Sequence, residues 1–107
     1  MMFLIKALIV LGISTTALSQ GVGLPKHSYL PTRGFVPDST TAVKIAIAVL
    51  GPIYGAHKIQ SQEPFIATLK DGVWTVVGTL DRGWKGGVAE IEISMTNGTV
   101  LRVSHGR

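Results

Sequence analysis

The chain has 107 residues, enough for one domain near the lower end of the size at which a hydrophobic core alone supports a fold. It contains no cysteine, which excludes disulfides, thiol catalysis and cysteine-bound metals. Ten Lys and Arg residues outnumber six Asp and Glu residues, but they form no basic run. This scattered positive charge argues against nucleic-acid binding and predicts a modest attraction to an acidic partner.

Residues 1–19 have the layout of a secretory signal peptide. Lys6 supplies a positive charge, an apolar run follows, and Ala17-Leu18-Ser19 fits the small-residue rule for a cleavage site. The run is shorter than the about 20 apolar residues of a transmembrane helix, although an uncleaved anchor or a buried helix is the alternative. We predict cleavage after Ser19 and export, with a cysteine-free domain suiting the bacterial periplasm better than a disulfide-rich extracellular scaffold.

Residues 20–37 are predicted to form an extended connector to a domain that spans residues 38–107. Three prolines and three glycines fall in this stretch, and proline lacks the N–H group that helices and central strands require. We expect the apolar residues Phe35 and Val36 to hold the end of the connector against the domain.

The domain begins with a predicted helix. Asp38 follows a proline and is a suitable N-cap, and the apolar residues after it recur at helical spacing. Gly51-Pro52 is expected to kink or end this helix, and Gly55 to cap it. Residues 56–62 are predicted to add one more turn, with Ile59 facing inward.

This helix is apolar almost all round. One face is formed by Ala42, Ile45, Ala46 and Val49, and a second by Val43, Ile47 and Leu50. A helix of this kind is usually buried on two sides, so we expect it to lie in the hollow of a curved sheet. The alternative is a homodimer in which Val43, Ile47 and Leu50 contact a second chain.

Alternating residues after Pro64 predict a first β-hairpin. Asp71-Gly72 is typical of a two-residue type I′ turn. This turn sets Leu69 opposite Trp74 and Ala67 opposite Val76, so that one face of the hairpin is apolar. Cross-strand pairs of these kinds are favourable.

Two further strands are predicted over residues 88–95 and 99–105. A two-residue turn between them would mix apolar and charged faces, so we expect a three-residue loop, Thr96-Asn97-Gly98, with a left-handed glycine. The resulting pairs are Ile93 with Leu101, Ile91 with Val103 and Glu92 with Arg102. The elements together predict an α+β fold, a helix packed on a curved four-stranded antiparallel meander.

No catalytic or metal-binding group is evident. His27, His57 and His105 are far apart in the sequence, whereas a zinc site needs clustered ligands. Ser104 and His105 are neighbours on one strand, so their side chains point to opposite faces. Glu90 and Glu92 share a face, but we expect an outer face on which Glu92 pairs with Arg102. We therefore expect no catalytic residue, metal or cofactor.

The loop over residues 81–87 is the best candidate for recognition. It places Trp84 between Arg82 and Lys85, and exposed Trp and Arg residues are favoured anchors at protein interfaces. We predict partner binding through these three residues together with Arg102 and Arg107 on the exposed sheet. The alternative is that Trp84 folds back onto the core.

Several short segments, in this order and spacing, resemble the NTF2-fold immunity proteins of bacterial polymorphic toxin systems, including those beside Rhs-type toxin genes. The resemblance covers about Pro31 to Arg107. It is carried by Arg33-Gly34-Phe35-Val36-Pro37-Asp38, Thr41-Ala42-Val43-Lys44-Ile45-Ala46, Pro52-Ile53-Tyr54-Gly55, Pro64-Phe65, Asp71-Gly72-Val73-Trp74, Gly86-Gly87-Val88-Ala89-Glu90-Ile91 and Val103-Ser104-His105-Gly106. It implies a reduced NTF2-like or cystatin-like architecture and the binding of a cognate toxin.

We therefore expect an exported protein that neutralises a toxin in the periplasm by stoichiometric occlusion. One alternative is an NTF2-like domain that binds a small ligand or acts as an enzyme, with a pocket between helix and sheet. Catalysis is disfavoured because the inward strand positions from Phe65 to Val103 carry no ionisable group. The other alternative is a periplasmic protease inhibitor of PepSY type, which has a similar shape.

Overall fold

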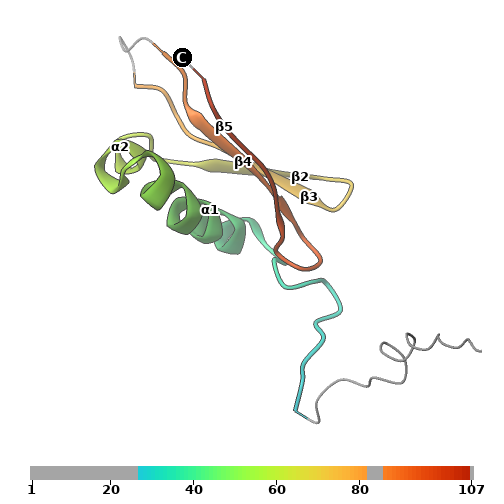
Figure 1. Ribbon diagram of the computed structural model, residues 1–107. Helices are drawn as coiled ribbons and strands as arrows, with labels where there is room; N and C mark the ends of the chain where they lie inside the picture. Colours follow the sequence, from blue (N-terminus) through green and yellow to red (C-terminus); the bar gives the residue numbers. More distant parts are fainter. Residues whose placement is uncertain (1–26, 82–85, 107) are drawn as a thin grey trace, which may run out of the picture.

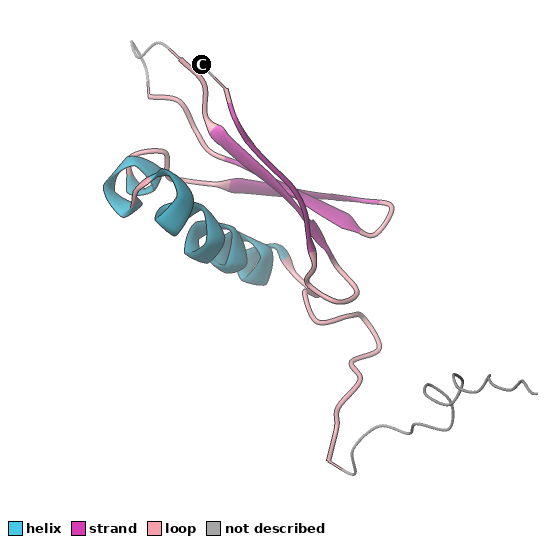
Figure 2. Cartoon of the chain, in the orientation of Figure 1, coloured by secondary structure: helices cyan, strands magenta, loops and turns pink. Residues whose placement is uncertain are grey.

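The computed structural model describes residues 27–81 and 86–106, and the predicted signal peptide lies outside these residues. Helix α1 (Ser39–Tyr54) and the short helix α2 (Ala56–Gln60) precede four strands (Figures 1 and 2). The strands are β2 (Ile66–Lys70), β3 (Val73–Val77), β4 (Ala89–Ser94) and β5 (Val100–His105). They form one antiparallel sheet in the order β2-β3-β4-β5, with α1 on one face. The predicted α+β meander is confirmed.

Local signals define both ends of α1. The backbone N–H of Thr41 donates to the Asp38 carboxylate at 2.8 Å, which confirms the N-cap and lowers the pKa of Asp38 from its ordinary value of 3.8. The helix is not stopped at Gly51-Pro52 but continues to Tyr54. It ends at Gly55, whose φ of 103° suits glycine and whose N–H donates to the Gly51 carbonyl at 2.7 Å. Within the described parts of the chain, no helix has the length and apolarity needed to cross a membrane.

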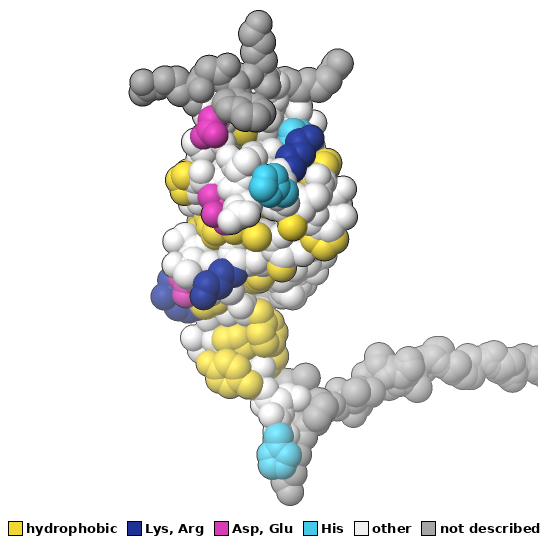
Figure 3. Space-filling view, turned by 90° about the vertical axis from the view of Figure 1, so that its left-hand side faces the viewer, with side chains coloured by type: hydrophobic (Ala, Val, Ile, Leu, Met, Phe, Trp, Pro, Cys, Tyr) yellow, Lys and Arg dark blue, Asp and Glu magenta, His cyan; other side chains and the backbone are white. Residues whose placement is uncertain are grey.

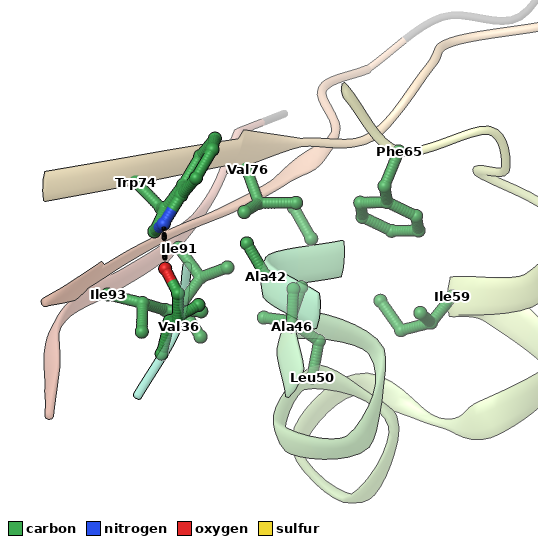
Figure 4. Close-up of a cluster of buried hydrophobic side chains, with 11 residues drawn as sticks. Val36, Ala42, Ala46, Leu50, Ile59, Phe65, Trp74, Val76, Ile91 and Ile93 are labelled. Carbon is green, nitrogen blue, oxygen red and sulfur yellow. Dashed lines mark hydrogen bonds between the residues drawn. The ribbon is translucent and has the colours of Figure 1, made fainter. Parts of the chain in front are cut away.

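Helix α1 packs on the sheet through one stripe of Ala42, Ala46 and Leu50, which are fully buried (Figure 4). Residues four apart lie above one another on a helix, and the two alanines allow its backbone to lie close to Val76 and Ile91 of the sheet. Ile59 of α2 is also buried, as predicted.

The helix faces differ from the sequence prediction. Leu50 was expected on the second face and in a homodimer contact, but none of its surface is exposed, so it is not available to a partner. Val43, Ile47, Ile45 and Val49 are all half-buried, on the flanks of the buried stripe. The orientation of α1 on the sheet decides which apolar residues are covered, and the spacing alone did not specify that orientation.

The β2–β3 hairpin has the predicted turn and register. Asp71 and Gly72 have φ values of 50° and 77°, as a type I′ turn requires, and Leu69 pairs with Trp74. The face predicted to be apolar is only partly covered, since Leu69 is 43% exposed. The tip of this hairpin extends beyond α1 (Figure 1), so the helix does not cover Leu69, whereas Trp74 opposite it is buried and bonded to the connector.

The β4–β5 connection differs from the prediction. Ile91 pairs with Val103 and Glu92 with Arg102, but Ile93 pairs with Val100 and not with Leu101, because a β-bulge shifts the register there. Leu101 is the extra residue and is 51% exposed. Gly98 has the predicted positive φ of 78°.

The loop between β4 and β5 is one residue longer than predicted, and it also holds the connector. The backbone N–H groups of Phe35 and Val36 donate to the carbonyls of Thr96 and Met95, both at 3.0 Å, and Met95 N–H donates to the Gly72 carbonyl at 2.9 Å. Within the hairpin, the Ser94 N–H donates to the Thr99 carbonyl at 2.8 Å and the Gly98 N–H to the Ser94 carbonyl at 2.9 Å, so residues 95–98 form the loop in place of the predicted three. The connector also fixes Trp74, whose indole N–H donates to the Val36 carbonyl at 2.7 Å (Figure 4).

Candidate functional site

A cleft of about 450 Å³ opens where α1 meets α2, beside the last residues of β5. Its lining combines aromatic, polar and charged side chains with backbone from the strand ends. The lining residues are Tyr54, Lys58, Ser61, Gln62, Thr79, Leu80, Asp81, Gly86, Gly87, His105 and Gly106. This volume is within the range of small-molecule sites in proteins.

Gln62 forms the floor of the cleft and is 6% exposed. Its Oε1 accepts the backbone N–H of Ala89 at 2.7 Å, and its Nε2 lies 2.9 Å from Nε2 of His105. Its backbone carbonyl accepts the N–H of Thr79 at 2.7 Å. A Cβ atom at Gly78 would lie 2.7 Å from Oε1 of Gln62, so glycine at that position leaves room for the side chain. Gln62 thus joins the segment after α2 to the ends of three strands.

These bonds fix the tautomer of His105. Its Nδ1 lies 2.7 Å from the Gly106 carbonyl, which only accepts, so Nδ1 carries the proton. Nε2 then accepts a hydrogen from the Gln62 amide, whose oxygen is turned toward Ala89. In this arrangement both ring nitrogens are engaged in hydrogen bonds. Its ring lies 4.9 Å from the ring of Tyr54, tilted by 50°.

The rim of the cleft carries Lys58 and Asp81, both exposed, and the apolar side chain of Leu80. Lys58 and Asp81 are not ion-paired with each other. On the face shown in Figure 3, charged side chains of both signs lie between separate apolar patches, and apolar atoms gather where the connector leaves the domain. The rim is therefore of mixed charge over a mainly uncharged interior.

Of the predicted partner-binding residues, the structure describes Arg102 alone. Arg82, Trp84, Lys85 and Arg107 lie outside the described residues. Arg102 lies on the outer sheet face, where its guanidinium bonds to the carboxylates of Glu92, at 3.1 Å, and Glu90. These bonds raise the pKa of Arg102. Because two carboxylates surround one guanidinium, this part of the outer face has a net negative charge.

The histidines do not form a metal site in the described structure. Within residues 27–81 and 86–106, no three His, Asp or Glu side chains are grouped as metal ligands would be. His105 instead faces the cleft, and Tyr54 lines it as well.

Sequence reasoning missed the Gln62–His105 pair. The sequence analysis assigned inward-facing positions only up to Val103. The same strand alternation puts His105 on the inner face, opposite Ala89. Gln62 had no comparable signal, because it follows a helix and belongs to no periodic pattern.

A sequence profile described as NTF2 fold immunity protein matches residues 41–107, well over half of the chain. The chain therefore belongs to the NTF2 fold immunity proteins. This match confirms the resemblance, although it begins at residue 41 and not at Pro31. Membership implies a toxin-binding, non-catalytic role. Comparisons with curated proteins and with solved structures give no match.

Proposed function

We propose that this chain is an exported immunity protein that binds a cognate bacterial toxin in the periplasm and neutralises it by stoichiometric occlusion. The observation that carries the proposal is the family match over residues 41–107. The signal-peptide pattern of residues 1–19 supports export.

The described interior supports binding over turnover. Among residues 27–81 and 86–106, Gln62 is the one buried side chain that is polar, and the remaining core is apolar. General acid–base or nucleophilic catalysis needs an ionisable group held beside the substrate. The histidine nearest this interior already has both nitrogens in hydrogen bonds.

Arg82, Trp84, Lys85, Arg102 and Arg107 remain the proposed toxin contacts. Positive charge at an interface rim chiefly accelerates association with an acidic partner. The double variant Arg82→Glu/Lys85→Glu should therefore lower the association rate by about tenfold at low salt. Lys70→Glu, at the exposed β2–β3 turn, is the matched control and should leave the rate unchanged. An unchanged rate in the double variant would exclude that patch.

A rescue assay tests the function itself. A candidate toxin, such as the product of an adjacent reading frame that proves to encode one, is directed to the periplasm of a host that also produces this chain, either complete or without residues 1–19. We expect the complete chain to restore growth and the truncated chain to fail. Equal rescue by both forms would contradict periplasmic neutralisation, and no rescue by either would contradict the immunity assignment to that toxin.

A further inference from the structure

We propose that the cleft beside Gln62 binds a carboxylate carried on a small apolar or aromatic group. This inference goes beyond toxin neutralisation and does not depend on it, because it concerns the chemistry of the cleft itself. It is drawn from three features of the described residues: an unused buried donor, an aromatic wall and a single lysine at the rim.

The buried donor belongs to Gln62. A primary amide has two N–H groups and one oxygen. The oxygen accepts from Ala89, and one N–H donates to His105. Among residues 27–81 and 86–106, the second N–H has no acceptor, although the side chain is 6% exposed and lines the cleft. Because a buried donor without a partner is unfavourable, this N–H favours a ligand oxygen at the floor.

The wall around this donor contains two aromatic rings, and the hydroxyls of Ser61 and Thr79 beside them donate to the carbonyls of Lys58 and Pro64. The rings of Tyr54 and His105 lie 4.9 Å apart, with Leu80 further out at the rim. The Tyr54 hydroxyl makes no hydrogen bond within the described residues and is a second available donor. Both nitrogens of His105 are already occupied. An apolar body with an oxygen acceptor therefore matches the interior better than a cation does.

The charges at the rim oppose each other. Among the described residues of the rim, Lys58 attracts a carboxylate and Asp81 repels one, so these two charges together do not select the sign of the ligand. The uncharged donors inside the cleft, the Gln62 N–H group and the Tyr54 hydroxyl, favour an anion over a cation. The formal net charge of +4 on the whole chain also favours an anion. A cation attracted by Asp81 and the Tyr54 ring would face the Gln62 N–H group.

Three ring compounds of similar size and different charge provide the test. Benzoate, benzamide and benzylamine are titrated into the full chain, and binding is followed by calorimetry and by the NMR signals of Tyr54 and His105. We expect benzoate to bind at least about fivefold more tightly than benzamide, and benzylamine to bind weakest, because charge-assisted hydrogen bonds are the stronger ones. Tighter binding of benzylamine than of benzoate, or no binding of benzoate at millimolar concentration, would overturn the proposal.

Rim variants locate the binding without disturbing the core. Lys58→Gln should weaken benzoate binding several-fold, and Asp81→Asn should strengthen it by a similar factor. Lys70→Gln and Asp71→Asn remove the same charges at the distant β2–β3 turn, and should have no effect. Gln62→Met removes the floor donors and should abolish binding. If that variant does not fold, the opposite effects of Lys58→Gln and Asp81→Asn on benzoate binding still test the proposal. Weaker benzoate binding by Asp81→Asn would contradict it.

The carboxylate has two plausible sources in the cell, an acidic side chain of a protein partner or a free small acid. A capped peptide, acetyl-Ala-Glu-Phe-amide, represents the first and benzoate the second. Tighter binding of the peptide supports an acidic protein partner, and tighter binding of benzoate supports a free acid. Failure of both would overturn the inference, while the rescue of cells from the toxin would be unaffected.

Discussion

The layer between α1 and the sheet has two ends that differ in what they enclose. At one end, Val36, Trp74 and Ile93 form a dry, apolar cluster whose one polar hydrogen, the indole N–H, is bonded to the Val36 carbonyl. At the other end, Gln62, His105 and Tyr54 line an open cleft. The same inner face of β4 runs through both ends, from Ile93 to Ala89.

This difference shows that the part of the sheet under α1 and the part beyond the end of α1 have different roles. Where the helix and the connector cover the sheet, apolar side chains are removed from water and stabilise the fold. Where the helix ends at Gly55 and the chain turns into α2, polar groups of the strand ends and the turn are exposed to the cleft. We infer that stability comes mainly from the first end and binding of the proposed carboxylate ligand from the second.

The largest expected effect is at the dry end. Ile91→Ala removes a fully buried side chain beneath α1 and should lower the free energy of unfolding by about 2–5 kcal/mol. Ile66→Ala, on the outer face and 58% exposed, is the matched control and should cost much less. Urea denaturation measures both. Equal losses would contradict the view that the inner layer stabilises the domain.

The attachment of the connector can be broken at Gly34. Its φ is 88°, and a Cβ atom there would lie 2.3 Å from the Met95 carbonyl oxygen. Gly34→Ala should therefore destabilise the fold by about 1–3 kcal/mol. Gly55→Ala also introduces a side chain at positive φ, but meets nothing within 4 Å, so it should cost less. A larger loss at Gly55 would show that the connector does not stabilise the dry end.

At the cleft end, Gln62→Leu tests whether the buried amide stabilises the fold. The variant keeps the volume but leaves the buried Ala89 N–H without its acceptor, so we expect a loss of about 1–3 kcal/mol despite the added apolar atoms. Gln60→Leu, exposed on α2, is the matched control and should be nearly neutral. An increase in stability for Gln62→Leu would show that this end also behaves as a hydrophobic core.

The smallest effect is expected at the start of α1. Because folding lowers the pKa of Asp38, its stabilisation is present above the ordinary value of 3.8 and is lost as pH falls through the lower folded value. Asp38→Ala should lower Tm by a few degrees at neutral pH and by progressively less in acid. Thermal unfolding followed by circular dichroism checks this. A Tm difference that does not shrink in acid would contradict the cap.

The sequence predicted those parts of the fold that local chemistry determines. The Asp71-Gly72 turn and the alternating residues beside it were enough to place Leu69 opposite Trp74. Asp38 and Gly55 marked the ends of α1 because their bonds lie within the helix. The β4–β5 register was not predictable in the same way, since a β-bulge at Leu101 interrupts the alternation on which the prediction relied.

The candidate site was less accessible to sequence reasoning. The inward position of His105 follows from strand alternation, but its partner Gln62 is 43 residues away and follows a helix without any repeating pattern. The two meet only because α2 returns the chain to the ends of β4 and β5. Whether Leu50 is buried or exposed likewise depends on how α1 is rotated on the sheet.

Titration of a toxin from which this chain rescues cells tests the central claim most directly. The account predicts that toxin activity falls in proportion to the added chain and disappears at one chain per toxin molecule. Loss of toxin activity at far smaller amounts would indicate catalytic turnover, and full activity in the presence of excess chain would show that no neutralising complex forms.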